Sequence, residues 1–268
     1  MQPMLNIALR AARKAGDIIA RASEQTERLK IETKGTNDFV TDIDRAAERE
    51  IVYHINKAFP EHAILGEESG LTENGDSEYQ WVIDPLDGTT NFIRGIPHYA
   101  VSIACLHKGV VEHAVVLDPI RREEFTASRG RGAQLNGRRI RVSTLASLEG
   151  SLIGTGIPYK SRNDHLIPQY TASLAAVTAQ TAGIRRAGAA ALDLAYVAAG
   201  RLDGFWEISL NRWDIAAGVL LIREAGGLIS DYQGGNNYLE NGHIVAANPK
   251  VLKPLLQTLK PHLGHLGK

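Results

Sequence analysis

The stretch Trp81-Val82-Ile83-Asp84-Pro85-Leu86-Asp87-Gly88-Thr89-Thr90-Asn91-Phe92 carries the strongest structural signal in this chain. Its first three residues form the apolar run of a core strand, and Pro85 has no backbone donor, so regular strand pairing is expected to stop there. Two carboxylates, Asp84 and Asp87, follow the strand, and they raise each other's pKa unless a cation neutralises them. The amides of the next turn, Gly88-Thr89-Thr90, can form an anion-binding nest, particularly where a helix begins. The stretch predicts a divalent cation beside a phosphate, although Asp-Pro and Asp-Gly are also ordinary turn dipeptides.

Acidic residues follow apolar runs or open helical patterns at two further places. Ala63-Ile64-Leu65-Gly66 leads into Glu67 and Glu68. Glu67 is the expected second contributor, although paired glutamates in a polar loop are usually a solvated surface feature. Asp214 stands at the start of an Ala-rich amphipathic pattern, where it is expected to open a helix as its cap. A helix cap can also bind metal, so the two roles of Asp214 are compatible.

The expected ligands indicate which metal the site prefers. All of them are oxygens, and the nine histidines are scattered without a His/Cys cluster at zinc spacing. Hard Mg²⁺ therefore suits the site better than Zn²⁺. A hard divalent ion of this kind can bind a phosphate and lower the pKa of a bound water.

Three segments together resemble the inositol monophosphatase family: Gly66-Glu67-Glu68, Trp81 to Phe92, and Trp213-Asp214 followed by Glu224 to Gly227. The resemblance runs in order through nearly the whole chain and is closest to the bacterial SuhB-type members. Thr-Thr-Asn-Phe and the downstream Glu207 are more similar to inositol monophosphatases than to phosphatases of fructose bisphosphate or phosphoadenosine phosphate. The resemblance implies Mg²⁺-dependent hydrolysis of myo-inositol monophosphate, or a similar small phosphate ester, by metal-activated water, with inhibition by lithium.

Residue by residue, the resemblance also implies the site. Glu67, Asp84 and the Leu86 carbonyl would hold a first Mg²⁺, while Asp84, Asp87 and Asp214 would hold a second. A third, looser ion near Glu67 is included in the expectation of two or three ions. Glu67 and the Thr89 hydroxyl are expected to orient and deprotonate the attacking water. Asp44 would fix Thr89 by hydrogen bonds, its alternative role being that of a polar helix residue.

The same resemblance implies the substrate contacts. The expected set is Asp87, Gly88, Thr89, Thr90, Gly188, Ala190 and Glu207. Ala189 stands where the family often has Thr or Ser, which leaves the preference for the inositol ring open. Lys34, in the loop Lys34-Gly35-Thr36-Asn37, resembles a lysine that approaches the site and helps to hold the third metal. A flexible surface lysine is the equally weighted alternative.

Composition favours a single compact enzyme. The 268 residues are 44% hydrophobic, enough for a large core, and 30 basic against 30 acidic residues give no global attraction to nucleic acid or to an anionic membrane. Charged residues interrupt the apolar pattern between Met4 and Ala22, which excludes a spanning helix and a signal-peptide core and favours a cytoplasmic protein. Cys105 lies inside an apolar run and is expected to be a core thiol.

Periodicity predicts two helices and then a sheet in the first half. Apolar residues recur at helical spacing from Leu5 to Ile19 and again from Ile43 to Ile55. Lys108-Gly109 and Asn136-Gly137 are hairpin signals, which favour an antiparallel sheet. The expected strands are Ala63 to Leu65, Trp81 to Ile83, His98 to Leu106, Val110 to Leu117, Glu124 to Ala127 and Gly132 to Leu135.

The second half alternates strands and helices, as in an α/β layer. Strands are expected at Ser151 to Thr155, Gly183 to Arg186, Asp203 to Glu207, Leu228 to Ser230 and Ile244 to Ala246, with helices at Ile167 to Ala179, at Ala189 to Ala199 and from Asp214 to Gly226. Asn248-Pro249 is expected to start a terminal helix. The polar stretch Thr144 to Gly150 divides the chain into residues 1–145 and 146–268, fused into one body. The family resemblance implies an α+β or α/β fold, a five-layered α-β-α-β-α sandwich.

A role in binding partners is the competing interpretation. SuhB-type proteins are associated with transcription complexes that make ribosomal RNA, so the resemblance allows partners such as RNA polymerase and its elongation factors. It also implies a homodimer. The helix Ala189 to Ala199, Arg185-Arg186 and the strand Gly204-Phe205-Trp206 could offer a flat contact face, unless the small residues pack within the core.

Overall fold

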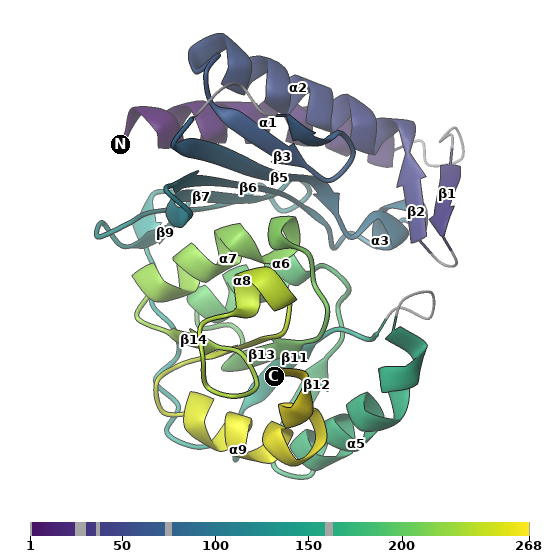
Figure 1. The fold of residues 1–268 in the computed structure, drawn as a ribbon, viewed down its shortest axis with the longest axis vertical. Helices are drawn as coiled ribbons and strands as arrows, with labels where there is room; N and C mark the ends of the chain where they lie inside the picture. The colour runs from purple at the N-terminus through teal and green to yellow at the C-terminus, as the bar shows by residue number, and fades with distance from the viewer. Residues whose placement is uncertain (1, 25–30, 36–37, 73–76, 159–162, 268) are drawn as a thin grey trace.

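The computed structural model describes residues 2–24, 31–35, 38–72, 77–158 and 163–267. Figure 1 shows five layers, which alternate between helices and sheets from the top of the view to the bottom. Two N-terminal helices form the outer layer, a large sheet follows, two helices lie in the middle, a second sheet comes next, and two helices close the other side. This is the predicted α-β-α-β-α sandwich.

The outer helices are α1 (Pro3–Ser23) and α2 (Asp42–Ala58), close to their predicted ranges. Their apolar faces pack on one side of the large sheet, in a core that includes Ile19, Ile51 and Trp81. Helix α2 begins with a capping box, in which Thr41 accepts from the Asp44 amide and Asp44 accepts from the Thr41 amide. Within the described residues, none of the helices combines the length and apolar character that a bilayer crossing requires.

The large sheet has eight strands in the order β10-β9-β8-β7-β6-β5-β3-β4. Their bounds are β3 Ala63–Gly66, β4 Gly70–Thr72, β5 Tyr79–Asp87, β6 Ala100–His107, β7 Val110–Asp118, β8 Glu123–Ser128, β9 Ala133–Leu135 and β10 Arg138–Arg139. The sheet is antiparallel as predicted, except that β3 pairs parallel to β5. That parallel pair brings the ends of both strands, with their acidic residues, to the same edge.

Strand β5 continues past the proline that was predicted to end its pairing. Asp84 pairs with Ser102 and Asp87 with Ala100, so Pro85-Leu86 stand opposite a single residue of β6. Regular pairing is interrupted at the proline, as predicted, but it resumes at Asp87 after a bulge, in which the Asp84 carboxylate accepts the Leu86 amide at 3.0 Å in place of a ladder partner. The bulge re-aims the chain between the two aspartates.

The middle helices are α6 (Ala190–Ala198) and α7 (Arg212–Glu224), and they separate the two sheets (Figure 1). Five strands make the second sheet in the order β12-β11-β13-β15-β14, with β11 parallel to β12 and β13. Their bounds are β11 Leu152–Thr155, β12 Gly183–Arg185, β13 Gly204–Glu207, β14 Leu228–Ser230 and β15 Ile244–Ala247. Helices α5 (Ile167–Thr178) and α9 (Leu252–Leu263) cover its outer face.

One hydrophobic core joins the large sheet to α6 and α7, so the two halves pack as one body. The predicted boundary between residues 145 and 146 lies between the last strand of the large sheet and the first strand of the second sheet. A division of the chain into two domains there stays a prediction. Helix α6 is almost wholly buried, and Phe205 and Trp206 of β13 are inaccessible. The helix and strand proposed as a dimer face are therefore core elements, and that prediction is wrong.

Two local predictions also need correction. Helix α9 begins at Leu252, because the Asn248 side chain accepts the amides of Lys250 and Val251 and so forms a turn before the helix. The backbone of Lys34 lies in β1 (Ile31–Gly35), which pairs with β2 (Asp38–Thr41), and not in a loop. Cys105 is fully buried, as predicted, and burial raises the pKa of its thiol to about 12.

Candidate active site

A cleft of about 1230 Å³ lies where the end of β5, the short helix α3 (Thr89–Ile93) and the first turns of α6 and α7 meet. Every predicted metal ligand and substrate contact lines it. Asp44 lies behind the wall and reaches the cleft through Thr89. The side chain of Lys34 lies outside the described structure. Sites at strand ends and helix starts, far apart in sequence, are thus brought together by the fold.

Asp84 is the most crowded carboxyl group in the cleft. It is only 2% exposed. Burial raises its pKa well above the usual value, and the negative charges of Glu67, Asp87 and Asp214 raise it further. Glu67 and Asp84 also share a side-chain hydrogen bond, which requires a proton on one of the two carboxyls. A cation bound between them would take the place of that proton.

Asp87 joins the cleft from the far side of the bulge. Burial raises its pKa to about 7, although the amides of Ala191 and Ala190 at the start of α6 oppose the shift by hydrogen bonding. The Ala191 amide donates to Asp87 Oδ2 at 2.7 Å. Asp87, at the end of β5, therefore links the large sheet to the middle helix layer.

Asp214 occupies the third position of helix α7, and not its first as predicted. Asn211 caps the helix, and its amide donates to Asp214 Oδ2 at 2.7 Å. The sequence suggested a cap because aspartate is common there, but Asn211 is equally suitable and precedes it. The capping-box bond fixes the position of the Asp214 carboxylate, whose negative charge contributes to the raised pKa of Asp84.

The donor set fits a hard divalent cation. Within the described ranges, eight carboxyl side chains and two guanidinium groups line the cleft. Among the side chains of those ranges, no three His, Cys, Asp or Glu residues stand together as a ready-made metal cage. Carboxylate oxygens crowded in this way with little basic compensation favour a cation such as Mg²⁺.

Thr89 is held by two acceptors. Its Oγ1 lies 2.9 Å from Asp44 Oδ1 and 3.1 Å from the Leu86 carbonyl oxygen, and it can donate a hydrogen bond to either. Asp44 is 1% exposed, and burial raises its pKa even though Thr41 and Thr89 donate to it. The structure thus places Asp44 behind Thr89, as the resemblance implies.

Glycine is required where α3 begins. Gly88 has φ of 94°, and a Cβ there would lie 3.0 Å from the His98 carbonyl oxygen and 3.2 Å from the Ala189 Cβ. Asn91 of α3 donates from Nδ2 to the His98 carbonyl at 2.8 Å and the Ala187 carbonyl at 2.9 Å. Helix α3 is therefore fixed to both halves of the molecule at the cleft.

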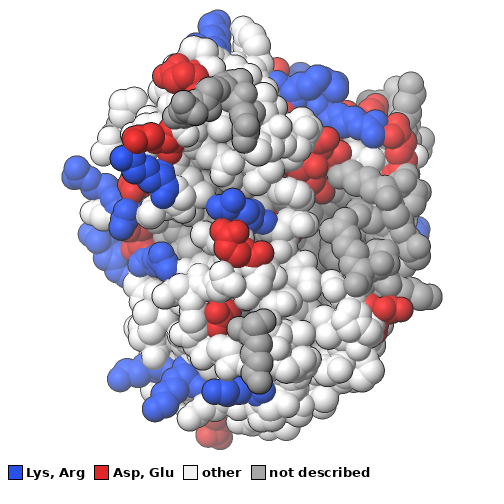
Figure 2. All heavy atoms as spheres, viewed as in Figure 1, with Lys and Arg blue, Asp and Glu red and all other residues white. Residues whose placement is uncertain are grey.

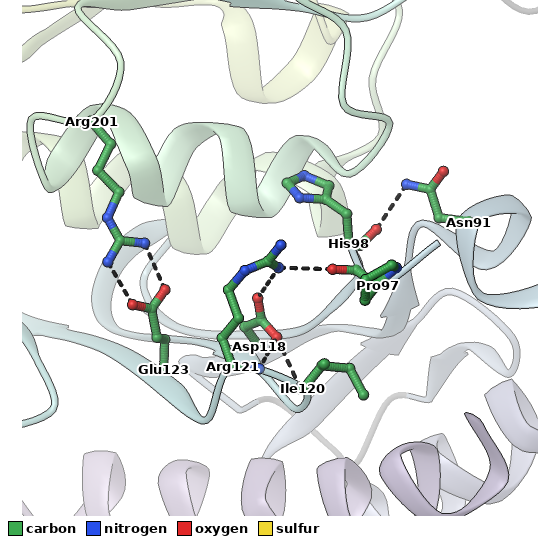
Figure 3. Close-up of polar contacts among 8 residues, drawn as sticks. All are labelled: Asn91, Pro97, His98, Asp118, Ile120, Arg121, Glu123 and Arg201. Carbon is green, nitrogen blue, oxygen red and sulfur yellow. Dashed lines mark hydrogen bonds and ion pairs between the residues drawn. The ribbon is translucent and has the colours of Figure 1, made fainter. Parts of the chain in front are cut away.

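Figure 3 shows how the segment beneath Asn91 is anchored. Arg121 donates from Nη1 to the Pro97 carbonyl and to Asp118 Oδ2, both at 2.8 Å. Asp118 is inaccessible to solvent and accepts the Arg121 amide at 2.8 Å through its other oxygen. Because Pro97 precedes His98, this network holds the carbonyl on which Gly88 and Asn91 pack.

Sequence reasoning missed three residues that build the cleft. Glu48 of α2 is 3% exposed and accepts the amides of Glu68 at 2.9 Å and Ser69 at 2.8 Å, so it fixes the turn that carries Glu67. Asp193 of α6 and Arg186 line the wall. Glu48 and Asp193 stand at buried positions of their helices, and an acid on an apolar face was the signal that could have revealed them.

Basic and acidic side chains are mixed over the face shown in Figure 2, without a broad area of one sign. That distribution agrees with the zero formal charge. On this face, nothing indicates a general nucleic-acid surface.

Comparison with known proteins places these features in context. The model of the inositol monophosphatase family matches residues 1–263. A Pseudomonas aeruginosa protein named Nus factor SuhB is 60% identical over 265 residues, 98% of each chain. The crystal structure of extragenic suppressor protein suhB from Bartonella henselae has a TM-score of 0.94 at 44% identity and covers 97% of this chain and 99% of its own. The structure of inositol monophosphatase from Anabaena has a TM-score of 0.86 at 39% sequence identity. The match covers 97% of this chain and 96% of the Anabaena chain.

Proposed function

The chain belongs to the inositol monophosphatase family, and from that premise we propose that it hydrolyses myo-inositol monophosphate, or a similar small phosphate ester, with Mg²⁺ as cofactor. The crowding of carboxyls around Asp84 is the observation that carries the proposal. Burial and three like charges make this group costly unless a cation neutralises it. The Anabaena structure, an inositol monophosphatase, shares the fold over almost the whole chain.

The proposed metal ligands are the acids and one carbonyl that line the same wall: Glu67, Asp84, Leu86, Asp87 and Asp214. When bound there, two or three Mg²⁺ ions would supply a water of lowered pKa and neutralise the charge of the phosphate and of the leaving oxygen. Lys34 is proposed to help with the third ion.

Thr89 and Glu67 are proposed to prepare the attacking water. Thr89 Oγ1 can donate its hydrogen bond to Asp44, 2.9 Å away, which leaves a lone pair on the hydroxyl to accept a hydrogen bond from the water. Glu67 then takes the proton as the water attacks phosphorus in line with the leaving alcohol. No residue of this chain needs to form a covalent phosphoenzyme.

Substrate binding is proposed to divide between the two walls of the cleft. Gly88, Thr89 and Thr90 offer backbone amides to the phosphate at the start of α3. Ring hydroxyls would meet Glu207, Asp87 and the backbone at Gly188 and Ala190. Gly188 has φ of 90°, so a side chain there would be strained.

Phosphate release from inositol 1-phosphate at millimolar Mg²⁺ tests the proposal. Asp84→Asn is expected to lose nearly all activity, since this residue would help to hold both proposed ions, while Glu61→Gln, a change of an exposed acid outside the cleft, is expected to keep wild-type activity. Chelation of the metal is expected to abolish the wild-type rate. No turnover by wild-type protein, or full activity of Asp84→Asn, would contradict the enzymatic proposal.

We also propose a role with RNA polymerase and its elongation factors, because the Pseudomonas and Escherichia coli relatives named Nus factor SuhB match 98% of this chain at 60% and 54% identity. The two roles can coexist on one protein. Asp87→Asn separates them: growth of cells that depend on this variant despite lost phosphate release would assign the cellular need to partner binding. Failure of growth with intact partner capture would assign it to catalysis.

We also propose that the protein forms a homodimer and that it is located in the cytoplasm. The contact face has to be sought outside α6 and β13, which are buried. Light scattering over a dilution series decides the assembly. A mass near the 29.1 kDa of one chain at every concentration would refute a stable dimer.

A further inference from the structure

The segment from Ser209 to Asn211 joins two parts of the proposed site. Glu207, which is proposed to contact the ring of the substrate, ends β13 just before this segment. Helix α7 begins just after it and carries the proposed metal ligand Asp214 at its third position. Ser209 has φ of 59°, a left-handed conformation that is strained for a residue with a side chain. Contacts from other parts of the fold are therefore needed to hold the segment in place.

Those contacts come from the turn that leads into β15. The Leu210 amide donates to the Gly242 carbonyl at 3.0 Å. The Ser209 amide donates to Nδ1 of His243 at 3.1 Å, so an imidazole ring stands where a strand would offer a carbonyl. Gly242 has φ of 69°, and a Cβ there would collide with the backbone of Leu210. The turn and the segment thus lie too close together for a side chain at Gly242.

The direction of the Ser209 bond determines the state of the imidazole ring. A backbone amide can only donate, so Nδ1 carries no proton, and His243 is neutral with its proton on Nε2. Among the described residues, the titratable side chains that face the ring are Asp231, Tyr232 and His265. Burial lowers the pKa of His243, the charge of Asp231 opposes this shift, and His265 adds to it. The surroundings therefore favour the neutral ring.

His243 acts from behind the cleft wall. The described residues that line the cleft include all three of the segment from Ser209 to Asn211, but not His243. Tyr232, whose ring centre lies 6.0 Å from that of His243, donates from its hydroxyl to the Glu207 carbonyl at 2.8 Å. Both ends of the segment are therefore fixed from the same side, and a change at His243 reaches the cleft through the backbone.

We propose that His243 is a positioning residue for hydrolysis: as a neutral acceptor it holds the segment from Ser209 to Asn211, and so keeps Glu207 and Asp214 correctly placed. This inference rests on the proposed function and adds a residue that touches neither the proposed ions nor the substrate. When Nδ1 takes up a proton, the ring and the Ser209 amide become two donors that face each other, and the bond is lost. Activity is therefore expected to fall as His243 is protonated.

Three variants test the inference through phosphate release. His243→Asn places an amide oxygen near the position of Nδ1 and cannot be protonated, so it is expected to stay within about twofold of wild type. His243→Leu leaves the Ser209 amide without its acceptor and is expected to lower release about tenfold. His113→Leu is the matched control, expected to keep the wild-type rate. His113 is also partly buried and shares a ring-nitrogen hydrogen bond of 2.9 Å with Ser128, but it does not line the described cleft.

NMR of the histidine ring nitrogens gives a readout that does not depend on activity. In metal-free protein with ¹⁵N-labelled histidine, the signals that are lost in His243→Asn identify this ring. At about pH 8 the ring is expected to be neutral with its proton on Nε2. As the pH is lowered, the wild-type rate divided by that of His243→Asn is expected to fall in parallel with the protonation of the ring.

Four results would overturn the inference and leave the proposed function intact. They are a neutral ring with its proton on Nδ1, a rate ratio that does not follow the titration of the ring, full activity of His243→Leu, and an equal loss in His243→Asn or in His113→Leu. No phosphate release by the wild-type protein would instead overturn the proposed function, and the inference with it, even with the expected ring signal.

Discussion

Replacing Gly88 by alanine tests how the start of α3 shapes the cleft. The residue has φ of 94°, and an added Cβ would approach the His98 carbonyl oxygen to 3.0 Å and the Cβ atoms of Ala189 and Tyr99 to 3.2 Å. The left-handed conformation costs about 1–2 kcal/mol for a residue with a side chain. The crowding adds about 1–3 kcal/mol, because two of the three neighbours are core residues and the third is backbone. Gly88→Ala is therefore expected to destabilise the protein by about 2–5 kcal/mol in total.

Gly95→Ala is the matched control. Gly95 also has a positive φ, 65°, but nothing lies within 4 Å of its Cβ position, so only the conformational cost of about 1–2 kcal/mol is expected. Urea denaturation of both variants isolates the packing cost at Gly88. Because α3 must shift to relieve the contact, phosphate release by Gly88→Ala is expected to fall about 100-fold. Equal stability and equal activity of the two variants would refute the proposed role of this close contact.

Three further predictions follow from groups around the cleft. Glu48→Gln is expected to lower phosphate release at least tenfold with little change in the protein's fold, because it weakens the charge-assisted bonds to the Glu68 and Ser69 amides that position Glu67. Circular dichroism checks the fold and steady-state kinetics checks the rate, and unchanged kinetics would count against this role. Lithium at tens of millimolar is expected to inhibit in a Mg²⁺ titration by occupying the weaker cation position, and an unaffected rate would argue against that arrangement. Asp193→Asn is expected to stabilise the metal-free protein against urea at pH 8 but not at pH 4. Burial raises the folded-state pKa of Asp193 above its unfolded value, so ionisation of this group costs stability as pH rises. A gain in stability that is the same at both pH values would contradict this reasoning.

The succession of elements was largely predictable from the sequence. Apolar runs and hairpin signals place β5 to β9 within a few residues of their observed bounds, because local periodicity reports directly which side chains are buried. Helices α1 and α2 follow the same logic. The sequence drew attention to Glu67, Asp84 and Asp87 because they follow apolar runs, and to Asp214 because it opens an amphipathic pattern.

Features that depend on contacts distant in sequence were not predictable. The β5 bulge needs the Asp84 side chain to replace a ladder partner, which no local pattern shows. The parallel pairing of β3 with β5 depends on chain topology. The role of Glu48 depends on the turn at Glu68, from whose amide, twenty residues away in the sequence, it accepts a hydrogen bond. The small residues of α6 suggested a dimer face because composition alone does not tell a core helix from an interface helix.

Diffraction from crystals grown with Mn²⁺ and inorganic phosphate tests the central claim most directly. Mn²⁺ accepts the oxygen ligands that suit Mg²⁺ and gives an anomalous signal that locates each ion. At least two ions are expected, held by Glu67, Asp84, Asp87 and Asp214, with phosphate against the start of α3 at Gly88 to Thr90. Crystals that show no ion at these carboxylates at millimolar Mn²⁺, with Asp84 and Glu67 still hydrogen-bonded to each other, would contradict it.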